Sequence, residues 1–97
     1  MADIQTGYMT PEAKRRLVNR INRATGHLTA IKKMIEDDRC ADDVLIQLAA
    51  ARSAVGQIAA KILEEHLADC MTSCMEGSPE EITQRISKAV ATVLRNS

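Results

Sequence analysis

The sequence predicts an all-α protein with three helices per chain, two long and one short. Its composition supports this, because Phe and Trp are absent, Tyr8 is the single aromatic residue, and the apolar side chains are mainly aliphatic. Such a composition favours closely packed helices over a β-sandwich. Apolar residues also recur at steps of three and four in three successive stretches. The 97 residues fit one domain, which we expect at 10–97 behind a flexible tail at 1–9.

The first helix should begin after Thr10. Thr is a good N-cap, Pro11 suits the first helical position, and Glu12 complements the positive end of the helix dipole. An apolar seam then advances by alternating steps of four and three, which is the spacing of a coiled coil. The seam consists of Leu17, Ile21, Ala24, Leu28, Ile31 and Ile35. The run Glu36-Asp37-Asp38-Arg39 should end this helix.

The second helix should begin at a cap formed by Asp42 or Asp43 and continue to about residue 73. Its apolar seam repeats the same alternating steps. The seam consists of Val44, Leu48, Ala51, Val55, Ile58 and Ile62. Neighbouring apolar positions widen the face, so that it needs more cover than one partner helix supplies. These positions are Leu45, Ala49, Ala59 and Leu63.

The third helix should follow a break at Gly77. Ser78 as N-cap, Pro79 at the first helical position and Glu81 at the third match a capping box. The apolar seam of this helix consists of Ile82, Ile86, Ala89 and Val93.

No signal peptide and no membrane span is evident in the sequence. The N-terminal stretch is polar, with no apolar run behind a basic start, and no segment approaches about 18 uninterrupted apolar residues. We therefore expect a cytoplasmic protein with no membrane partner. Its three cysteines should be reduced thiols that are available for metal or redox chemistry.

Cys40, His66 and Cys70 form the donor set of a predicted metal site. His66 and Cys70 are four residues apart, so their side chains share one face of a helix. Cys40 and His66 are separated by most of the second helix, which at about 1.5 Å per residue amounts to roughly 35–40 Å. Two antiparallel copies of that helix solve this geometry. Cys40 of one chain then meets His66 and Cys70 of the other, and a two-fold dimer has two equal sites.

The donor types indicate the metal. Two thiolates and one imidazole are soft ligands that suit Cu(I) well and Zn(II) acceptably. Zn(II) usually takes four ligands, so a three-ligand site favours Cu(I). Cys74 continues the same face and is a candidate additional thiol. The alternative is that each cysteine is a small buried hydrophobe and that His66 is a polar residue at a helix end.

A stripe of cations should run along the first helix. Residues 10–39 carry eight Lys or Arg against four Asp or Glu, whereas residues 40–84 carry two against eight. Arg16, Arg20, Arg23 and His27 advance by steps of four and three, with Lys14 and Arg15 beside them and no acidic partner at i+4. Such a stripe can neutralise phosphates of duplex DNA. The lack of aromatic residues argues against single strands, and a merely solvated helix face is the alternative.

Taken together, these stretches resemble the copper-sensitive operon repressor (CsoR-type) family of small bacterial regulators, over roughly residues 10–95. The stretches that carry the resemblance are Asn19-Arg20-Ile21-Asn22-Arg23, Gly26-His27-Leu28, Lys33-Met34-Ile35-Glu36, Cys40, Val44-Leu45-Ile46-Gln47-Leu48-Ala49-Ala50 and Glu65-His66-Leu67-Ala68-Asp69-Cys70. The resemblance implies a disc-like tetramer built as a dimer of dimers, without a helix-turn-helix. It implies that the apo form binds double-stranded operator DNA and that the ligand releases it. It also implies a trigonal Cu(I) site of Cys40, His66 and Cys70 across the dimer interface.

We therefore expect a Cu(I)-sensing repressor with no enzymatic activity. The residues expected to contact DNA are Lys14, Arg15, Arg16, Arg20, Arg23 and Arg52. One alternative is a repressor of the same family that senses persulfide or another metal, and a second is a metal-storage or delivery protein that does not bind DNA. A Cys–His enzyme built on Cys70 and His66 is disfavoured, because the sequence offers no evident oxyanion hole or substrate cleft.

Overall fold

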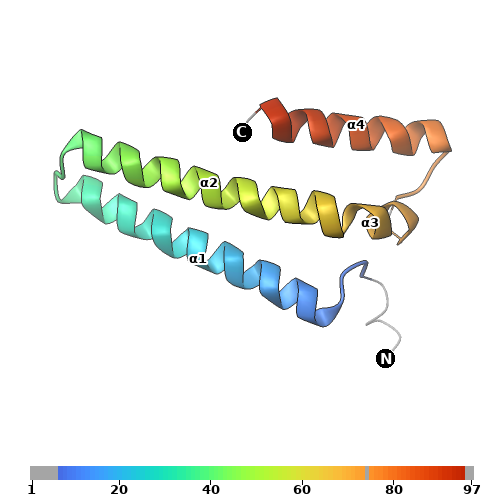
Figure 1. The fold of residues 1–97 in the computed structure, drawn as a ribbon, viewed down its shortest axis with the longest axis horizontal. Helices are drawn as coiled ribbons and strands as arrows, with labels where there is room; N and C mark the ends of the chain where they lie inside the picture. Colours follow the sequence, from blue (N-terminus) through green and yellow to red (C-terminus); the bar gives the residue numbers. More distant parts are fainter. Residues whose placement is uncertain (1–6, 74, 96–97) are drawn as a thin grey trace.

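The computed structural model describes residues 7–73 and 75–95, and this part of the chain is all-α. It contains the four helices labelled in Figure 1: α1 (Pro11–Glu36), α2 (Ala41–Glu65), α3 (Leu67–Ser73) and α4 (Pro79–Arg95). The predicted all-α class is confirmed for this part of the chain. The predicted number of three helices is wrong, because the expected second helix is interrupted at His66 and its last two turns form α3. Residues 1–6 of the expected tail lie outside the described residues.

The two long helices form an antiparallel hairpin. α3 prolongs α2, and α4 returns along α2, on the side away from α1 in the view of Figure 1. The start of α1 is as expected, since the Ala13 N–H donates to Thr10 Oγ1 at 3.1 Å and Pro11 occupies the first helical position. This cap satisfies one of the backbone donors that the first turn of a helix leaves unpaired.

A tight turn at Asp37–Cys40 joins α1 to α2. The Arg39 N–H donates to the Met34 carbonyl at 2.9 Å and the Asp38 N–H to the Ile35 carbonyl at 3.1 Å, which is the hydrogen-bond pattern of a Schellman motif. Asp38 has a φ of 57°, in the left-handed conformation that this motif requires. The run of acidic residues therefore ends α1 as predicted.

The predicted cap of the second helix is wrong. Cys40 occupies the N-cap of α2 and its side chain makes no capping hydrogen bond, whereas Asp42 and Asp43 lie in the first helical turn. The Schellman turn leaves so few residues before α2 that the helix begins ahead of both aspartates. Their carboxylates still complement the positive end of the helix dipole.

The core of the hairpin lies along one heptad seam. Its buried apolar residues are Ala13, Leu17, Ala24, Ile31, Ala51 and Ile58. Half of the predicted α1 seam is not in it, because Ile21, Leu28 and Ile35 are about half exposed. Arg20 and His27 instead occupy half-buried positions between the core residues, and the His27 Nε2–H donates to Gln47 Oε1 across the hairpin at 2.8 Å.

The last helix is capped as the sequence predicts. The Ser78 N–H donates to Glu81 Oε1 at 2.7 Å and the Glu81 N–H donates to Ser78 Oγ at 3.2 Å, which is a capping box. Gly77 precedes it with a φ of 122°, and a Cβ at that position would lie 2.6 Å from Glu81 Oε1. The apolar face of α4 is only half-buried at Ile82 and Val93, so this helix is loosely covered by its own chain.

Candidate functional site

The three predicted donors lie at opposite ends of the α2 rod. Cys40 precedes the 25-residue helix and His66 follows it. At a rise of about 1.5 Å per residue, the helix separates the two residues by roughly 37 Å. Within residues 7–73 and 75–95, no group of three His, Cys, Asp or Glu side chains is close enough to hold a metal ion. The structure thus brings His66 and Cys70 near each other and leaves Cys40 far from both.

His66 is positioned by the break between α2 and α3. Its backbone has φ −127° and ψ −13°, and its N–H donates to the Ile62 carbonyl at 3.0 Å. The Cys70 N–H donates to the His66 carbonyl at 3.1 Å, so one helical turn connects the two residues and their side chains share a face. His66 is 8% exposed and is the one buried polar residue in the described part of the chain.

The cysteines differ in their chemical state. Cys40 is an exposed free thiol, whereas Cys70 is disulfide-bonded in this structure. Because the thiolate is the form that ligates metal, Cys70 has to be reduced before it can serve as a donor. The predicted additional thiol, Cys74, lies outside the described residues.

A carboxylate stands beside the imidazole of His66. Glu65 Oε1 lies 4.0 Å from His66 Nε2, while Glu65 Oε2 accepts from Lys61 Nζ at 2.9 Å. This hydrogen bond and the charge of Lys61 lower the pKa of Glu65, with smaller contributions from His66 and from Arg16 on α1. The ring of a metal-bound His commonly donates its other N–H to such a carboxylate. Sequence reasoning missed this pair, although Lys61 and Glu65 stand at i, i+4 spacing on one helix face.

The cationic stripe of α1 lies close to this end of the hairpin. Arg16 and Arg23 are exposed and Arg20 is half-buried, and none of the three forms an ion pair within the residues that the structure describes. Lys14 and Arg15, which directly precede Arg16, are also exposed. His27 is not part of the solvated stripe, because its ring is hydrogen-bonded to Gln47.

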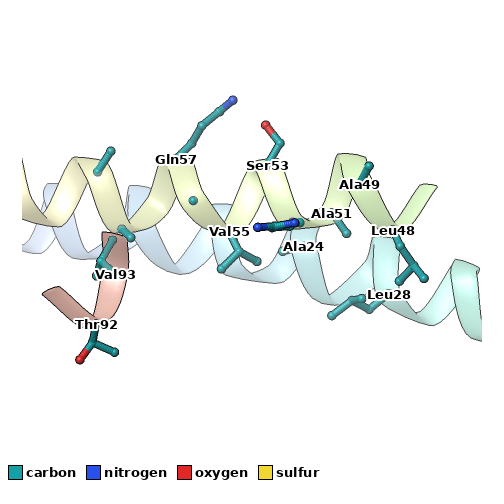
Figure 2. Close-up of a pocket in the computed structure, with 14 residues that line it drawn as sticks. Ala24, Leu28, Leu48, Ala49, Ala51, Ser53, Val55, Gln57, Thr92 and Val93 are labelled. Carbon is teal, nitrogen blue, oxygen red and sulfur yellow. The ribbon is translucent and has the colours of Figure 1, made fainter. Parts of the chain in front are cut away.

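Arg52 lies apart from that stripe. It lines a groove of about 1040 Å³ between the hairpin and the C-terminal end of α4, together with Leu28, Leu48, Val55 and Val93. Figure 2 shows Leu28 of α1 and Leu48 of α2 among the side chains that line this groove. Large apolar side chains are unusually exposed on this side of the hairpin, at 48% for Leu28, 40% for Leu48 and 50% for Val55.

In the described part of the chain, no helix is both long and apolar enough to span a bilayer. Comparison with known proteins identifies the family of the chain. The family model for metal-sensitive transcriptional repressors matches residues 13–95.

Two relatives of the chain are named copper-sensing transcriptional repressors. The copper-sensing transcriptional repressor RicR of Mycobacterium tuberculosis is 34% identical over 88 residues, which cover 88% of this chain and 92% of that protein. The copper-sensing transcriptional repressor CsoR of Bacillus subtilis is 28% identical over 74 residues, which cover 76% of this chain and 73% of that protein. No solved structure matches the chain.

Proposed function

The chain belongs to the family of metal-sensitive transcriptional repressors, and we propose that it is a Cu(I)-responsive repressor that binds operator DNA without metal. Membership of this non-enzymatic regulatory family bears out the expectation that the chain is not an enzyme. The observation that carries the copper proposal is the placement of soft donors at both ends of one rigid helix. The cytoplasm is the corresponding location for such a repressor.

The proposed metal site is completed by two chains. Reduced Cys70 and His66 of one protomer and Cys40 of its partner supply two thiolates and one imidazole, a donor set that fits Cu(I). When bound, the ion would supply a fixed bridge between the ends of two helices. The Glu65 carboxylate lies 4.0 Å from His66 Nε2, beyond hydrogen-bond distance, so it would have to move closer to orient the ring of a metal-bound His66.

The exposed apolar side of the hairpin supports self-association. Monomers rarely leave contiguous apolar surface of this kind uncovered, and the hairpin exposes Ile21, Leu28 and Ile35 on α1 beside Leu48 and Val55 on α2. A second hairpin packed antiparallel on this side would form a four-helix bundle. The half-buried face of α4 would then serve the further pairing of dimers into a tetramer.

Duplex DNA is the proposed partner of the cationic side. The proposed contacts are Lys14, Arg15, Arg16, Arg20, Arg23 and Arg52. Because the α1 arginines have no carboxylate partners in the described chain, their charges remain available to phosphates. A metal-storage protein would have no use for this stripe.

The decisive experiment measures DNA and copper together. Reduced protein is titrated into duplex DNA from its own upstream promoter, with and without one equivalent of Cu(I) per protomer, and fluorescence anisotropy gives the dissociation constant. We expect tight binding without metal and at least a tenfold loss of affinity with copper, a coupling of about 1.4 kcal/mol or more. Absence of binding by the metal-free protein would refute the repressor proposal.

Mixed variants test whether two chains share the site. Cys40→Ser and Cys70→Ser proteins should each fail to bind Cu(I) tightly. After the two are mixed and allowed to exchange subunits, the heterodimer regains one intact site, made from Cys40 of one variant and His66 and Cys70 of the other. A site within one chain predicts no recovery. The matched control is the Cys40→Ser/Cys70→Ser double variant mixed with either single variant, which should recover nothing.

A second candidate inducer is a sulfur species. The disulfide-bonded state of Cys70 favours it, because a thiol that forms disulfides also reacts with persulfides by sulfur exchange. Under this reading, a low-molecular-weight persulfide should release DNA from the reduced protein while Cu(I) leaves binding unchanged.

A further inference from the structure

We propose that the groove where α1 and α2 meet at Arg20 and Lys61 binds a backbone phosphate of duplex DNA. This inference rests on the proposed DNA-binding function and adds a contact from α2 to a surface otherwise assigned to α1. The groove has a volume of about 230 Å³. Its lining residues are Arg20, Gln57, Ala60, Lys61 and Glu64.

The two cations of this groove come from different helices. Arg20 is half-buried in the α1 seam and has no ion-pair partner among the described residues. Lys61 is also half-buried, with 41% of its side chain exposed, and its ammonium is held by Glu65 at 2.9 Å. Side chains restrained in this way lose less conformational freedom on binding than fully solvated ones. Arg20 therefore offers an unpaired cation in this groove, and Lys61 adds a second that has to share its ammonium between Glu65 and a phosphate.

The surroundings agree with an anionic ligand from DNA. Gln57 adds an uncharged amide that can donate to a phosphate oxygen. Arg16 lies one turn before Arg20 on α1, and Arg20 and Lys61 line the same groove. The α1 stripe thus continues onto α2 through Lys61. Glu64 in the lining should oppose phosphate binding, as should the Glu65 carboxylate that pairs with Lys61.

The groove also lies close to the proposed copper donors. Lys61 precedes His66, the C-cap of α2, by five residues, which is about one and a half turns. Glu65 contacts both of them, at 2.9 Å from Lys61 Nζ and 4.0 Å from His66 Nε2. A phosphate contact at Lys61 would therefore be the DNA contact nearest to the metal site along α2.

The test measures the DNA affinity of the full-length, reduced, metal-free protein over a range of salt concentrations. It uses two DNA duplexes of about 30 bp, one from the promoter and one of scrambled sequence. Lys61→Gln should weaken binding to both duplexes by a similar factor, roughly 3- to 10-fold, and should lower the slope of log affinity against log salt by about one per bound groove. Lys61→Arg should retain binding, and Glu64→Gln should strengthen it. Lys88→Gln on α4 is the matched control, because it removes the same charge without lining the groove.

The outcomes separate this inference from the function on which it rests. Equal effects of Lys61→Gln and Lys88→Gln on affinity and salt slope, in a protein that still binds DNA, would overturn the groove and leave the repressor proposal intact. Failure of the unmodified protein to bind DNA would overturn both. If calorimetry shows that Lys61→Gln abolishes binding of inorganic phosphate but leaves DNA affinity unchanged, the groove is a site for free anions and the DNA assignment is wrong.

Discussion

Leu28 offers a direct test of whether the apolar side of the hairpin is an interface between two copies of the chain. Leu28 remains 48% exposed in one protomer, and full burial of a leucine side chain contributes about 2 kcal/mol. Burying the remaining half should therefore contribute about 1 kcal/mol per copy, or about 2 kcal/mol in a two-fold dimer. Leu28→Ser should weaken dimerisation by roughly 30-fold.

Sedimentation equilibrium of the reduced protein measures this change, with circular dichroism as a check that the variant remains helical. Ile46→Ser is the matched control, since Ile46 is 64% exposed but does not line the groove. Tight copper binding should also become dependent on protein concentration in Leu28→Ser, because the proposed site needs both chains. Equal dimerisation constants for the two variants would refute the assignment of this side as the interface.

Three further predictions concern the ends of helices. Asp38→Gly should raise the free energy of unfolding by about 0.5–1 kcal/mol in urea titrations, because glycine adopts the left-handed φ of 57° without a Cβ penalty; a decrease would contradict the Schellman assignment. Ser78→Ala should cost about 1 kcal/mol through loss of the capping box, seen as faster amide exchange in α4 with α1 unaffected. Glu65→Gln should remove a stabilisation that is fully present above the ordinary carboxyl pKa. Since Lys61 lowers the folded-state pKa of Glu65, the wild-type protein loses this contribution as pH falls through the lowered value. Identical acid-side stability curves for the two proteins would show that the pair contributes nothing.

Local signals along the chain were sufficient to predict the helix ends at Thr10 and Ser78. Both depend on a side chain that bonds to a backbone N–H within three residues, so a short stretch of sequence contains all the relevant chemistry. The start of α2 could not be predicted in this way. Two aspartates of good capping type follow Cys40, but the Schellman turn at the end of α1 fixes where the next helix begins.

The side of α1 that packs inward was also ambiguous. The predicted seam combines two series of residues, each with a spacing of seven. Leu17, Ala24 and Ile31 form the series that is buried, whereas Ile21, Leu28 and Ile35 form the series that is about half exposed. Periodicity identifies an apolar helix but does not tell which neighbour covers which stripe. No Gly or Pro lies beside the break at His66, so the sequence predicts a continuous helix there. The donor residues of the candidate site were named from their chemistry, while their relation across two chains is beyond what one protomer contains.

The position of the donors fixes the register of the proposed dimer. For Cys40 of one antiparallel α2 to meet the His66–Cys70 turn of the other, the two-fold axis has to cross the helices midway between them, near residue 54. This part of α2 is where small side chains are concentrated, and they allow close approach of two backbones. They are Ala49, Ala50, Ala54, Ala59 and Ala60, whereas Ala51 is already buried in the core of the hairpin. Gly56 belongs to the same stretch, and a Cβ placed there meets nothing within 4 Å in one protomer. The spacing of the metal donors and the distribution of alanines along α2 therefore lead independently to the same axis, although one follows from coordination chemistry and the other from helix packing.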